Sequence, residues 1–373
     1  MPEPHRRIAR SLAYLSLLAV LVVGLLAGGP VLAAPPTQDE LVRLAAASLH
    51  DGYDVLITGQ AQRPLVEKSN EFGQLRNSAE RLADTLRRRE INAAYGLRFV
   101  SAQLHLIDLS LTAESARIIV KATEEVRLSF QSGSKPHDPA RDVTIMRIPH
   151  TFTFAGTDAG WQLVLDEEEP FPISPHSPPI APMPQPARVR PVGSSSGPKP
   201  GLASPRAAGY YSWSAAADYL RQFALSYNSA YRRFDGDAAG GDCTNFISQA
   251  LRAGGWQDKL GWYLDWNNWW YNDANQTRTW TYAPAMFQFM QTSGRATFLQ
   301  YLNDLWVGDV LQLDFDRDGT MDHTMGVDDK TSSDLSGIFL SYHTRDTYHR
   351  ALSDIYASNP SANYYAERIT GTY

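Results

Sequence analysis

The chain has a single cysteine, Cys243, among its 373 residues. No disulfide can therefore form within the chain, which excludes the small disulfide-stapled domains common among exported proteins. A solitary cysteine is either a buried hydrophobic residue or a reactive thiol. Its setting, between Gly240-Gly241-Asp242 and an amphipathic run, favours the reactive thiol.

The chain also lacks an excess of positive charge. Its net charge of −6 gives no sign of a nucleic-acid partner. Beyond the N-terminal region, no segment is long and apolar enough to cross a bilayer. Composition therefore does not favour a nucleic-acid-binding protein or a protein with several membrane spans.

Residues 1–34 have the pattern of a signal peptide. A basic start is followed by an apolar core from Leu12 to Ala27 and by small residues at Ala33 and Ala34. Because this core is short for a membrane span, we expect cleavage, secretion and no stable membrane insertion afterwards. The alternative is an uncleaved membrane anchor.

Proline divides the rest of the chain. Twelve of the 23 prolines lie between Pro170 and Pro205. Such a stretch cannot bury a core, so residues 169–209 are predicted to form an extended spacer; the alternative is a proline-rich ligand for a partner domain. Residues 37–168 and 210–373 are the two predicted domains.

The first domain has helical periodicity before strand alternation. One helix is predicted over 40–47, and a second carries apolar residues at three- and four-residue spacing: Phe72, Leu75, Ala79, Leu82 and Leu86. Alternating segments follow, which predicts an α+β domain. This order resembles the cone-shaped domains of the nuclear-transport-factor-2-like (NTF2-like) type. His105 and His150 are expected to be ordinary strand residues, and the domain an accessory module.

Cys243 lies at the predicted start of a helix in the second domain. Asp242 is a good N-cap, and the apolar face continues to Gly254-Gly255. A helix N-terminus carries partial positive charge and unpaired N–H groups, which favour a thiolate and can bind an oxyanion. We therefore expect Cys243 to be a nucleophile.

A cysteine nucleophile needs a base, and the base needs an orienting group. His323 opens one predicted strand and His343 closes the next, so antiparallel pairing would bring those ends together. We expect His323 to be the base and His343 its orienting partner. A structural role for His323 is the alternative, and the third position could instead belong to one of three other residues: Asp328, Asp346 or His349.

Several motifs then resemble the putative amidase domain family, which is similar to the papain-like NlpC/P60 and CHAP cysteine hydrolases. They are Tyr227-Asn228-Ser229-Ala230-Tyr231, Gly240-Gly241-Asp242-Cys243-Thr244-Asn245-Phe246-Ile247-Ser248-Gln249, Ala253-Gly254-Gly255-Trp256, Gly308-Asp309-Val310 and Asp322-His323. The resemblance implies a papain-like α+β fold over 210–373. It also implies Cys243 as nucleophile, His323 as base, His343 as third polar residue, and no cofactor.

Aromatic residues near these motifs are candidates for substrate contact. Tyr227 or Tyr231 could donate to the oxyanion, although core packing is the more ordinary role. Six of the nine tryptophans fall between Trp256 and Trp280. Trp266 and Trp269 among them could line a groove for an extended polymer, or they could pack in the core.

An acidic loop raises the question of a metal. Asp314, Asp316, Asp318 and Asp322 have the spacing of a calcium loop. Met325 stands where a bidentate carboxylate would be expected, and no helix precedes the loop. A solvated acidic turn is therefore the preferred interpretation.

The sequence as a whole predicts a secreted cysteine amidase or peptidase. The resemblance implies an amide bond of cell-wall peptide as the substrate. A non-catalytic wall-binding protein and a transferase that uses the same cysteine–histidine pair are the alternatives.

Overall fold

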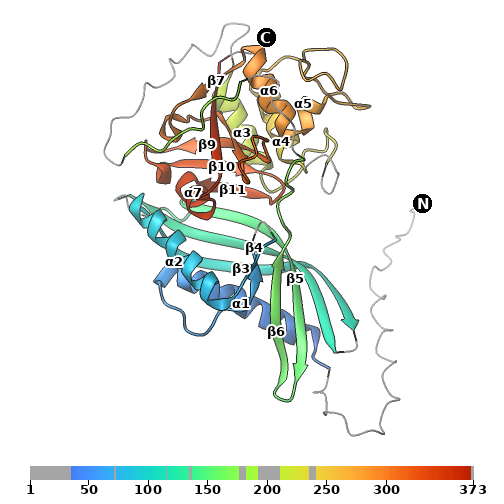
Figure 1. Cartoon of the computed structure of the whole chain (residues 1–373), viewed down its shortest axis with the longest axis vertical. Coiled ribbons are helices and arrows are strands. Elements are labelled where there is room, and N and C mark those ends of the chain that lie inside the picture. Colours follow the sequence, from blue (N-terminus) through green and yellow to red (C-terminus); the bar gives the residue numbers. More distant parts are fainter. Residues whose placement is uncertain are drawn as a thin grey trace, which may run out of the picture.

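The computed structural model describes residues 35–70, 73–114, 116–133, 137–175, 182–191, 211–234 and 241–370. They form two lobes, with the N-terminal lobe below the C-terminal lobe in Figure 1. The predicted signal peptide, residues 1–34, lies outside the described residues. Among the helices that are described, none combines the length and apolar character needed to cross a bilayer.

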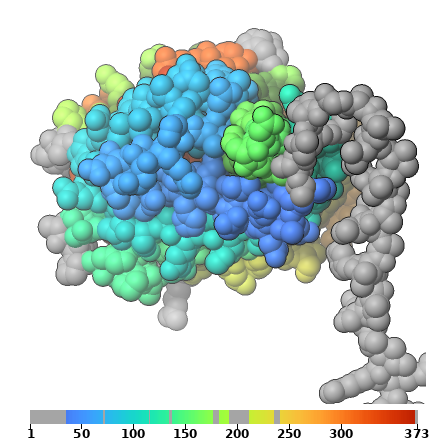
Figure 2. Space-filling model, turned by 90° about the horizontal axis from the view of Figure 1, so that it is seen from below, coloured from blue at the N-terminus to red at the C-terminus, as the bar shows by residue number. Residues whose placement is uncertain are grey.

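The N-terminal lobe confirms the predicted order of helices first and hairpins afterwards. Its elements are α1 (Gln38–Thr58), β1 (Lys68–Ser69), β2 (Leu75–Arg76), α2 (Ser78–Ala94), β3 (Leu97–Glu114), β4 (Arg117–Ser132), β5 (Val143–Thr157) and β6 (Gly160–Glu168). Strands β3 to β6 form an antiparallel sheet. The buried residues of α1 and of alternating positions along β4 share one apolar core. Seen from below, residues of α1 and α2 lie across the face of this lobe (Figure 2).

The second helix begins later than its apolar spacing predicts. Asn77 accepts from the N–H groups of Ala79 and Glu80, and the Glu80 carboxylate accepts from the Asn77 N–H. This capping box starts α2 at Ser78. Leu75 therefore lies in β2 rather than in the helix, and Phe72 is outside the described residues.

The two histidines of this lobe differ. His105 is an exposed residue of β3, as expected. His150 on β5 is buried, with Nδ1 2.6 Å from Asp166 Oδ1 and Nε2 3.0 Å from Glu124 Oε2. Burial alone would lower the pKa of His150, but its two carboxylate partners outweigh burial and raise this pKa to about 9. His150 is thus part of a buried ionic cluster and not an ordinary strand residue.

The C-terminal lobe is a six-stranded antiparallel sheet with helices on both faces. Its elements are α3 (Trp213–Phe223), α4 (Cys243–Ala253), α5 (Arg278–Thr281), α6 (Ala283–Ser293), β7 (Ala296–Leu299), η1 (Leu302–Asp304), β8 (Val310–Asp314), β9 (His323–Lys330), η2 (Leu335–Gly337), β10 (Ile338–Tyr342), β11 (Thr347–Ala351), α7 (Leu352–Ser358) and β12 (Asn363–Ile369). The strand order is β7-β12-β8-β9-β10-β11.

The two faces of this sheet have different partners. A Cβ on Gly326 of β9 would meet Leu220 of α3 and Ile247 of α4, so α3 and α4 cover that face. Residues of α7 pack with Met325 and Val327, which point the other way. Alternation along β9 therefore assigns even-numbered residues to the α4 face and odd-numbered residues to the α7 face.

The two lobes share one sheet. Strand β11 pairs antiparallel with β5, with Thr347 opposite Met146 and Tyr348 opposite Ile145. The result is a continuous twelve-stranded sheet through both lobes. The described part of the proline-rich stretch is also extended but docked, because the Ala187 N–H donates to the Tyr364 carbonyl at 2.7 Å. This part is extended, as predicted, and it also packs against the C-terminal lobe.

Candidate active site at Cys243

Helix α4 presents Cys243 as its first residue. Gly241 precedes it with φ +83°, a left-handed conformation that suits glycine. Asp242 stands at the N-cap position, but its side chain makes no capping hydrogen bond. Its carboxylate accepts instead from the Phe234 N–H at 2.9 Å and the Asn245 amide at 2.8 Å. The N-cap position is as predicted, whereas the carboxylate braces the loop before the helix.

The thiol of Cys243 is enclosed by threonines. Cys243 is 1% exposed, and its Sγ lies 3.7 Å from Thr244 Oγ1. The Thr324 backbone and the Thr344 hydroxyl also lie beside the sulfur. Burial raises the pKa of this thiol, and the surrounding hydrogen-bonding groups offset only part of the rise. In this conformation the thiol form is favoured, contrary to the expectation from the helix dipole.

Thr344 is held in a strained conformation against the helix. Its φ is +85°, which is unfavourable for a β-branched residue. Its Oγ1 is buried without a hydrogen-bond partner of good geometry among the described residues. A Cβ at Gly241 would approach that oxygen to 2.8 Å, so only glycine leaves room for it. Strain and an unsatisfied hydroxyl therefore coincide next to the thiol.

His343 lies on the α4 face of the sheet. Its ring stacks on Phe246 with centroids 3.9 Å apart. Its Nδ1 is 2.7 Å from Asp242 Oδ2, and its Nε2 is 2.9 Å from the Phe223 carbonyl oxygen. Both ring nitrogens face acceptors, so His343, the residue after β10, links the start of α4 to the end of α3.

His323 lies on the other face. It pairs with Leu313 in the β8–β9 ladder, and its ring centroid is 5.0 Å from that of Phe171 and 5.0 Å from that of Tyr342. Its Nε2 is buried and has no hydrogen-bond partner among the described residues. Burial, followed by the positive charges of Arg345 and Arg350, lowers the pKa of His323 to about 3.

The predicted cysteine–histidine pair is therefore not joined in this structure. Strands β9 and β10 do pair antiparallel and bring their ends together, as expected. Alternation, however, directs His323 away from α4 and His343 toward it. The Thr324 hydroxyl, 2.9 Å from that of Thr244, occupies the α4 face beside the cysteine instead. His343 does not orient His323, because its own ring nitrogens are bound to Asp242 and the Phe223 carbonyl.

The two tyrosines have structural partners. The Tyr227 hydroxyl donates to Asp346 at 2.8 Å, and its ring lies 4.4 Å from that of His343. Tyr231 packs against Trp280 and Tyr271 in an aromatic cluster. Core packing, the more ordinary of the two predicted roles, describes Tyr231, while Tyr227 braces the turn after β10.

The tryptophans divide between core and surface. Trp269 is fully buried and donates to Ser248 Oγ at 3.3 Å, so its predicted place in a substrate groove is wrong. Trp256 and Trp280 are buried beside it. Trp266 is half-buried against Tyr282. Trp262 is 65% exposed and lies outside the core.

The acidic loop between β8 and β9 is closed largely by its own backbone. Asp314, Asp316 and Asp322 bring carboxylate oxygens within 4.8 Å of one another. Asp314 accepts from the Asp318 and Gly319 N–H groups. Asp318 is not part of this three-carboxylate group, and its side chain accepts a hydrogen bond from the Thr320 N–H at 2.7 Å. Burial, then the nearby carboxylates, raises the pKa of Asp322 to about 7. These contacts support a hydrogen-bonded acidic turn.

Known proteins share this C-terminal region. Residues 210–366 match a family model described as a putative amidase domain. The match covers most of the C-terminal lobe and less than half of the chain. Two curated relatives of Bacillus subtilis (strain 168) match it in part. Uncharacterized protein YhbB is 30% identical over 152 residues, covering 40% of this chain and 47% of the relative. Uncharacterized protein YjcM is 31% identical over 144 residues, covering 36% and 31%. The chain thus spans less than half the length of either relative.

Solved structures match the N-terminal third. A putative dehydratase of the NTF2-like family from Streptomyces avermitilis is 18% identical, with 36% of this chain and 98% of that chain covered and a TM-score of 0.24. An NTF2-like protein from Cytophaga hutchinsonii is 6% identical, with 36% and 99% covered and a TM-score of 0.21. The mixed α+β character of the chain follows from its own elements.

Three features of the site escaped sequence reasoning: the threonines around the thiol, the Asp242–His343 pair, and the face on which His323 lies. The sequence did contain a signal for the face on which His323 lies. Gly326 has the parity of Thr324, and a glycine in a strand permits close approach of a packed helix. That parity indicates that Thr324, and not His323, faces α4.

Proposed function

We propose that the amidase domain hydrolyses an amide bond with Cys243 as the nucleophile. The supporting observation is the placement of this lone thiol at the first residue of α4. The helix ladder begins with the Phe246 N–H donating to the Asp242 carbonyl at 2.9 Å. The N–H groups before Phe246 are therefore free of intrahelical partners and can stabilise the oxyanion of a tetrahedral intermediate.

His323 is the base that we propose. Its buried Nε2 has no hydrogen-bond partner among the described residues, whereas His343 has both ring nitrogens engaged by acceptors. Because burial lowers its pKa to about 3, His323 is a weak base where it now lies, and the proposed role requires the ring to leave this apolar position. We assign His343 the role of a positioning residue that holds Asp242 and the start of α4.

This assignment includes a movement. His323 is the first residue of β9, and its ring now lies among Phe171, Phe315 and Tyr342. The ring must turn around the end of the strand to reach the sulfur when substrate binds. Leaving a buried polar atom without a hydrogen-bond partner costs about 1–3 kcal/mol. Movement of the His323 ring to a site where Nε2 has a partner would recover part of this free energy.

The reaction is an acyl transfer to water. His323 takes the thiol proton, and the sulfur attacks the amide carbon to give a tetrahedral oxyanion. The C–N bond breaks as His323 returns the proton to the leaving amine. Water, deprotonated by His323, then attacks the thioester, and the thiol leaves with that proton. No oxidant or cofactor is required.

A cell-wall peptide is the substrate class that the resemblance to the NlpC/P60 and CHAP hydrolases suggests. We propose that the protein meets this substrate outside the cell, after removal of residues 1–34. An amine in place of water would make the same chemistry a transfer, which added amine acceptors would reveal as new amide products.

The test compares purified full-length variants on digested cell-wall peptides, with release of new amines as the readout. Cys243→Ala and His323→Gln should each lower kcat by at least about 10²-fold while keeping the melting temperature of the wild type. His343→Gln should lower thermal stability as well. Wild-type activity in Cys243→Ala would refute the nucleophile, and wild-type activity in His323→Gln would refute the base.

A further inference from the structure

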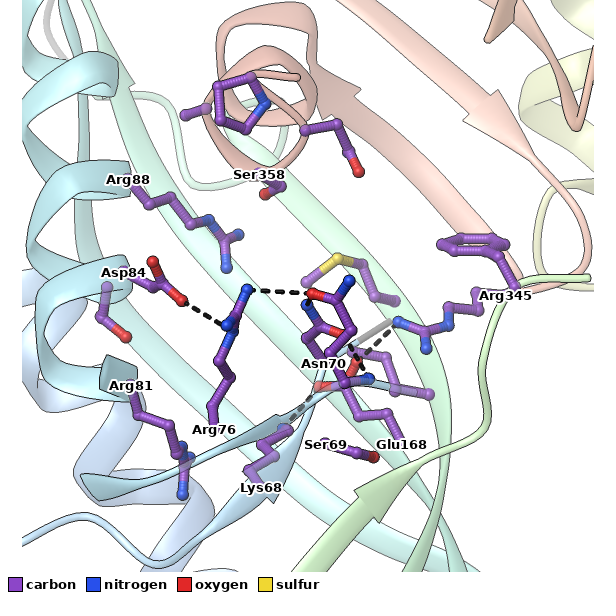
Figure 3. A pocket seen from close by; sticks show the side chains of 18 of the residues that line it. Lys68, Ser69, Asn70, Arg76, Arg81, Asp84, Arg88, Glu168, Arg345 and Ser358 are labelled. Atoms are coloured by element: carbon purple, nitrogen blue, oxygen red, sulfur yellow. Dashed lines mark hydrogen bonds and ion pairs between the residues drawn. The ribbon is translucent and has the colours of Figure 1, made fainter. Parts of the chain in front are cut away.

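A cavity of about 570 Å³ lies between the two lobes. Helices α1 and α2 and strands β1 and β2 form one side of it, and the end of β10, the β10–β11 turn and the residues after α7 form the other (Figure 3). Tyr342, which lines it, faces away from α4. Cys243 does not line it, so this cavity is separate from the thiol.

The cavity has an excess of positive charge. Seven of its lining side chains are lysine or arginine, and three are aspartate or glutamate. These cations share carboxylates in pairs. Asp84 lies 3.5 Å from Arg76 and 3.2 Å from Arg87, and Glu168 lies 2.6 Å from Lys68 and 2.8 Å from Arg345. Lys68 also lies 3.4 Å from Asp166, so the unbalanced positive charge is that of the Arg76–Arg87 pair, which shares only Asp84.

Three further arginines line the cavity. Arg88 and Arg350 share the buried carboxylate of Asp354, each at 2.7 Å. Arg81 donates to the Val66 carbonyl, and burial lowers its pKa although the charges of Asp166 and Glu168 offset part of this effect. Arg76 extends toward the middle of the cavity in Figure 3, with its Nε 3.5 Å from Asp84, beyond a good hydrogen bond, and its Nη2 donating to Gln74 Oε1 at 3.0 Å. A bound anion would offer this guanidinium a closer acceptor than Asp84.

Part of the remaining wall is apolar. Leu49 and Leu56 of α1, Met146 and Ile148 of β5, and Phe171 line it. A cavity of this volume accommodates a small organic molecule. Because cationic side chains line one part and apolar side chains another, the cavity suits a molecule with an apolar body and one negatively charged end. Guanidinium groups bind carboxylates and phosphates alike, because both accept two parallel hydrogen bonds.

We propose that the cavity between the lobes binds an organic anion with an apolar body, its carboxylate or phosphate held by Arg76 and its neighbours. The proposal does not depend on the amidase activity. It does place the ligand next to that site, since Phe171 and Tyr342 line the cavity and also contact the ring of His323.

Calorimetric titration of the full-length protein with four eight-carbon probes tests the proposal. Octanoate and octyl phosphate carry the anion, while octanol and octylammonium are the neutral and cationic controls. At least one anion should bind at a single saturable site, at least about 10-fold more tightly than octanol, and more weakly as salt rises. The preferred anion identifies the head group of the ligand.

Two arginine variants locate the binding. Arg76→Gln should weaken the binding of the preferred anion by about 10-fold, as expected for the loss of one charge-assisted contact. Arg63→Gln is the matched control, because Arg63 is 57% exposed, pairs with Asp51 and does not line the cavity. Equal affinity for octanol and both anions, or equal effects of the two substitutions, would overturn the proposal.

Discussion

Replacing Asp354 by asparagine removes the charge that joins the lobes. The Asp354 side chain is 2% exposed and accepts from Arg88 Nε at 2.7 Å, from Arg350 Nε at 2.7 Å and from the Asn92 amide at 2.8 Å. Burial alone would raise the pKa of this carboxyl, but the two guanidinium groups hold it well below its usual range. The folded state therefore prefers the ionised form.

The size of the effect follows from what asparagine leaves behind. Two largely buried guanidinium groups, 23% and 9% exposed, would lose their shared carboxylate. Breaking a buried ion pair on one side costs about 3–5 kcal/mol. We expect Asp354→Asn to lower the free energy of unfolding by that amount at pH 7, measured by urea denaturation followed through tryptophan fluorescence.

The pH dependence gives a second check on the same residue. Because the folded pKa of Asp354 lies below the unfolded value near 4, its contribution is present at neutral pH and lost as pH falls through the acid range. The difference between wild type and Asp354→Asn should therefore shrink on acidification. Asp51→Asn, which removes a partly exposed ion pair with Arg63, should cost at most about 1 kcal/mol. A loss below about 1 kcal/mol for Asp354→Asn would show that Arg88 and Arg350 do not depend on the charge of this carboxylate.

Three further outcomes are expected. The raised pKa of His150 means that its stabilising charge is present below pH 6.5 and lost as pH rises toward 9. The free energy of unfolding should fall by about 3 kcal/mol over that window in the wild type but not in His150→Gln; an equal pH dependence in both would contradict this. Gly241→Ala should lower the melting temperature, because it adds a strained φ and a Cβ 2.8 Å from Thr344 Oγ1, and an unchanged temperature would count against the packing described. Iodoacetamide should alkylate Cys243 far more slowly in the native protein than in urea, since burial raises the thiol pKa; equal rates would show an open thiol.

Local patterns in the sequence sufficed for much of the fold. Apolar periodicity and the glycines around Asp242 predicted the helix that starts at Cys243. Alternation predicted strands β9 and β10 and their antiparallel pairing. These features depend on contacts within a few tens of residues, which is the range that such patterns report.

Other features depend on distant partners. The carboxylate of Asp242 meets His343, 101 residues later, and no local pattern distinguishes this role from N-capping. Tryptophan density did not reveal which rings are buried, because Trp269 and Trp262 lie in the same loop region yet differ in exposure from 0% to 65%. The cavity between the lobes is lined by side chains from both domains, so the sequence pattern of either domain alone does not predict it.

The shared sheet has a consequence for dividing the chain. Strand β11 ends the sheet of the C-terminal lobe, and β5 covers its outer edge. A C-terminal lobe produced without residues 1–209 would expose the backbone N–H and C=O groups of Thr347 and Tyr348 as a template for another strand. We therefore expect such a fragment to self-associate more readily than the full chain. Full separation of the lobes would also require breaking a β-ladder rather than bending a linker.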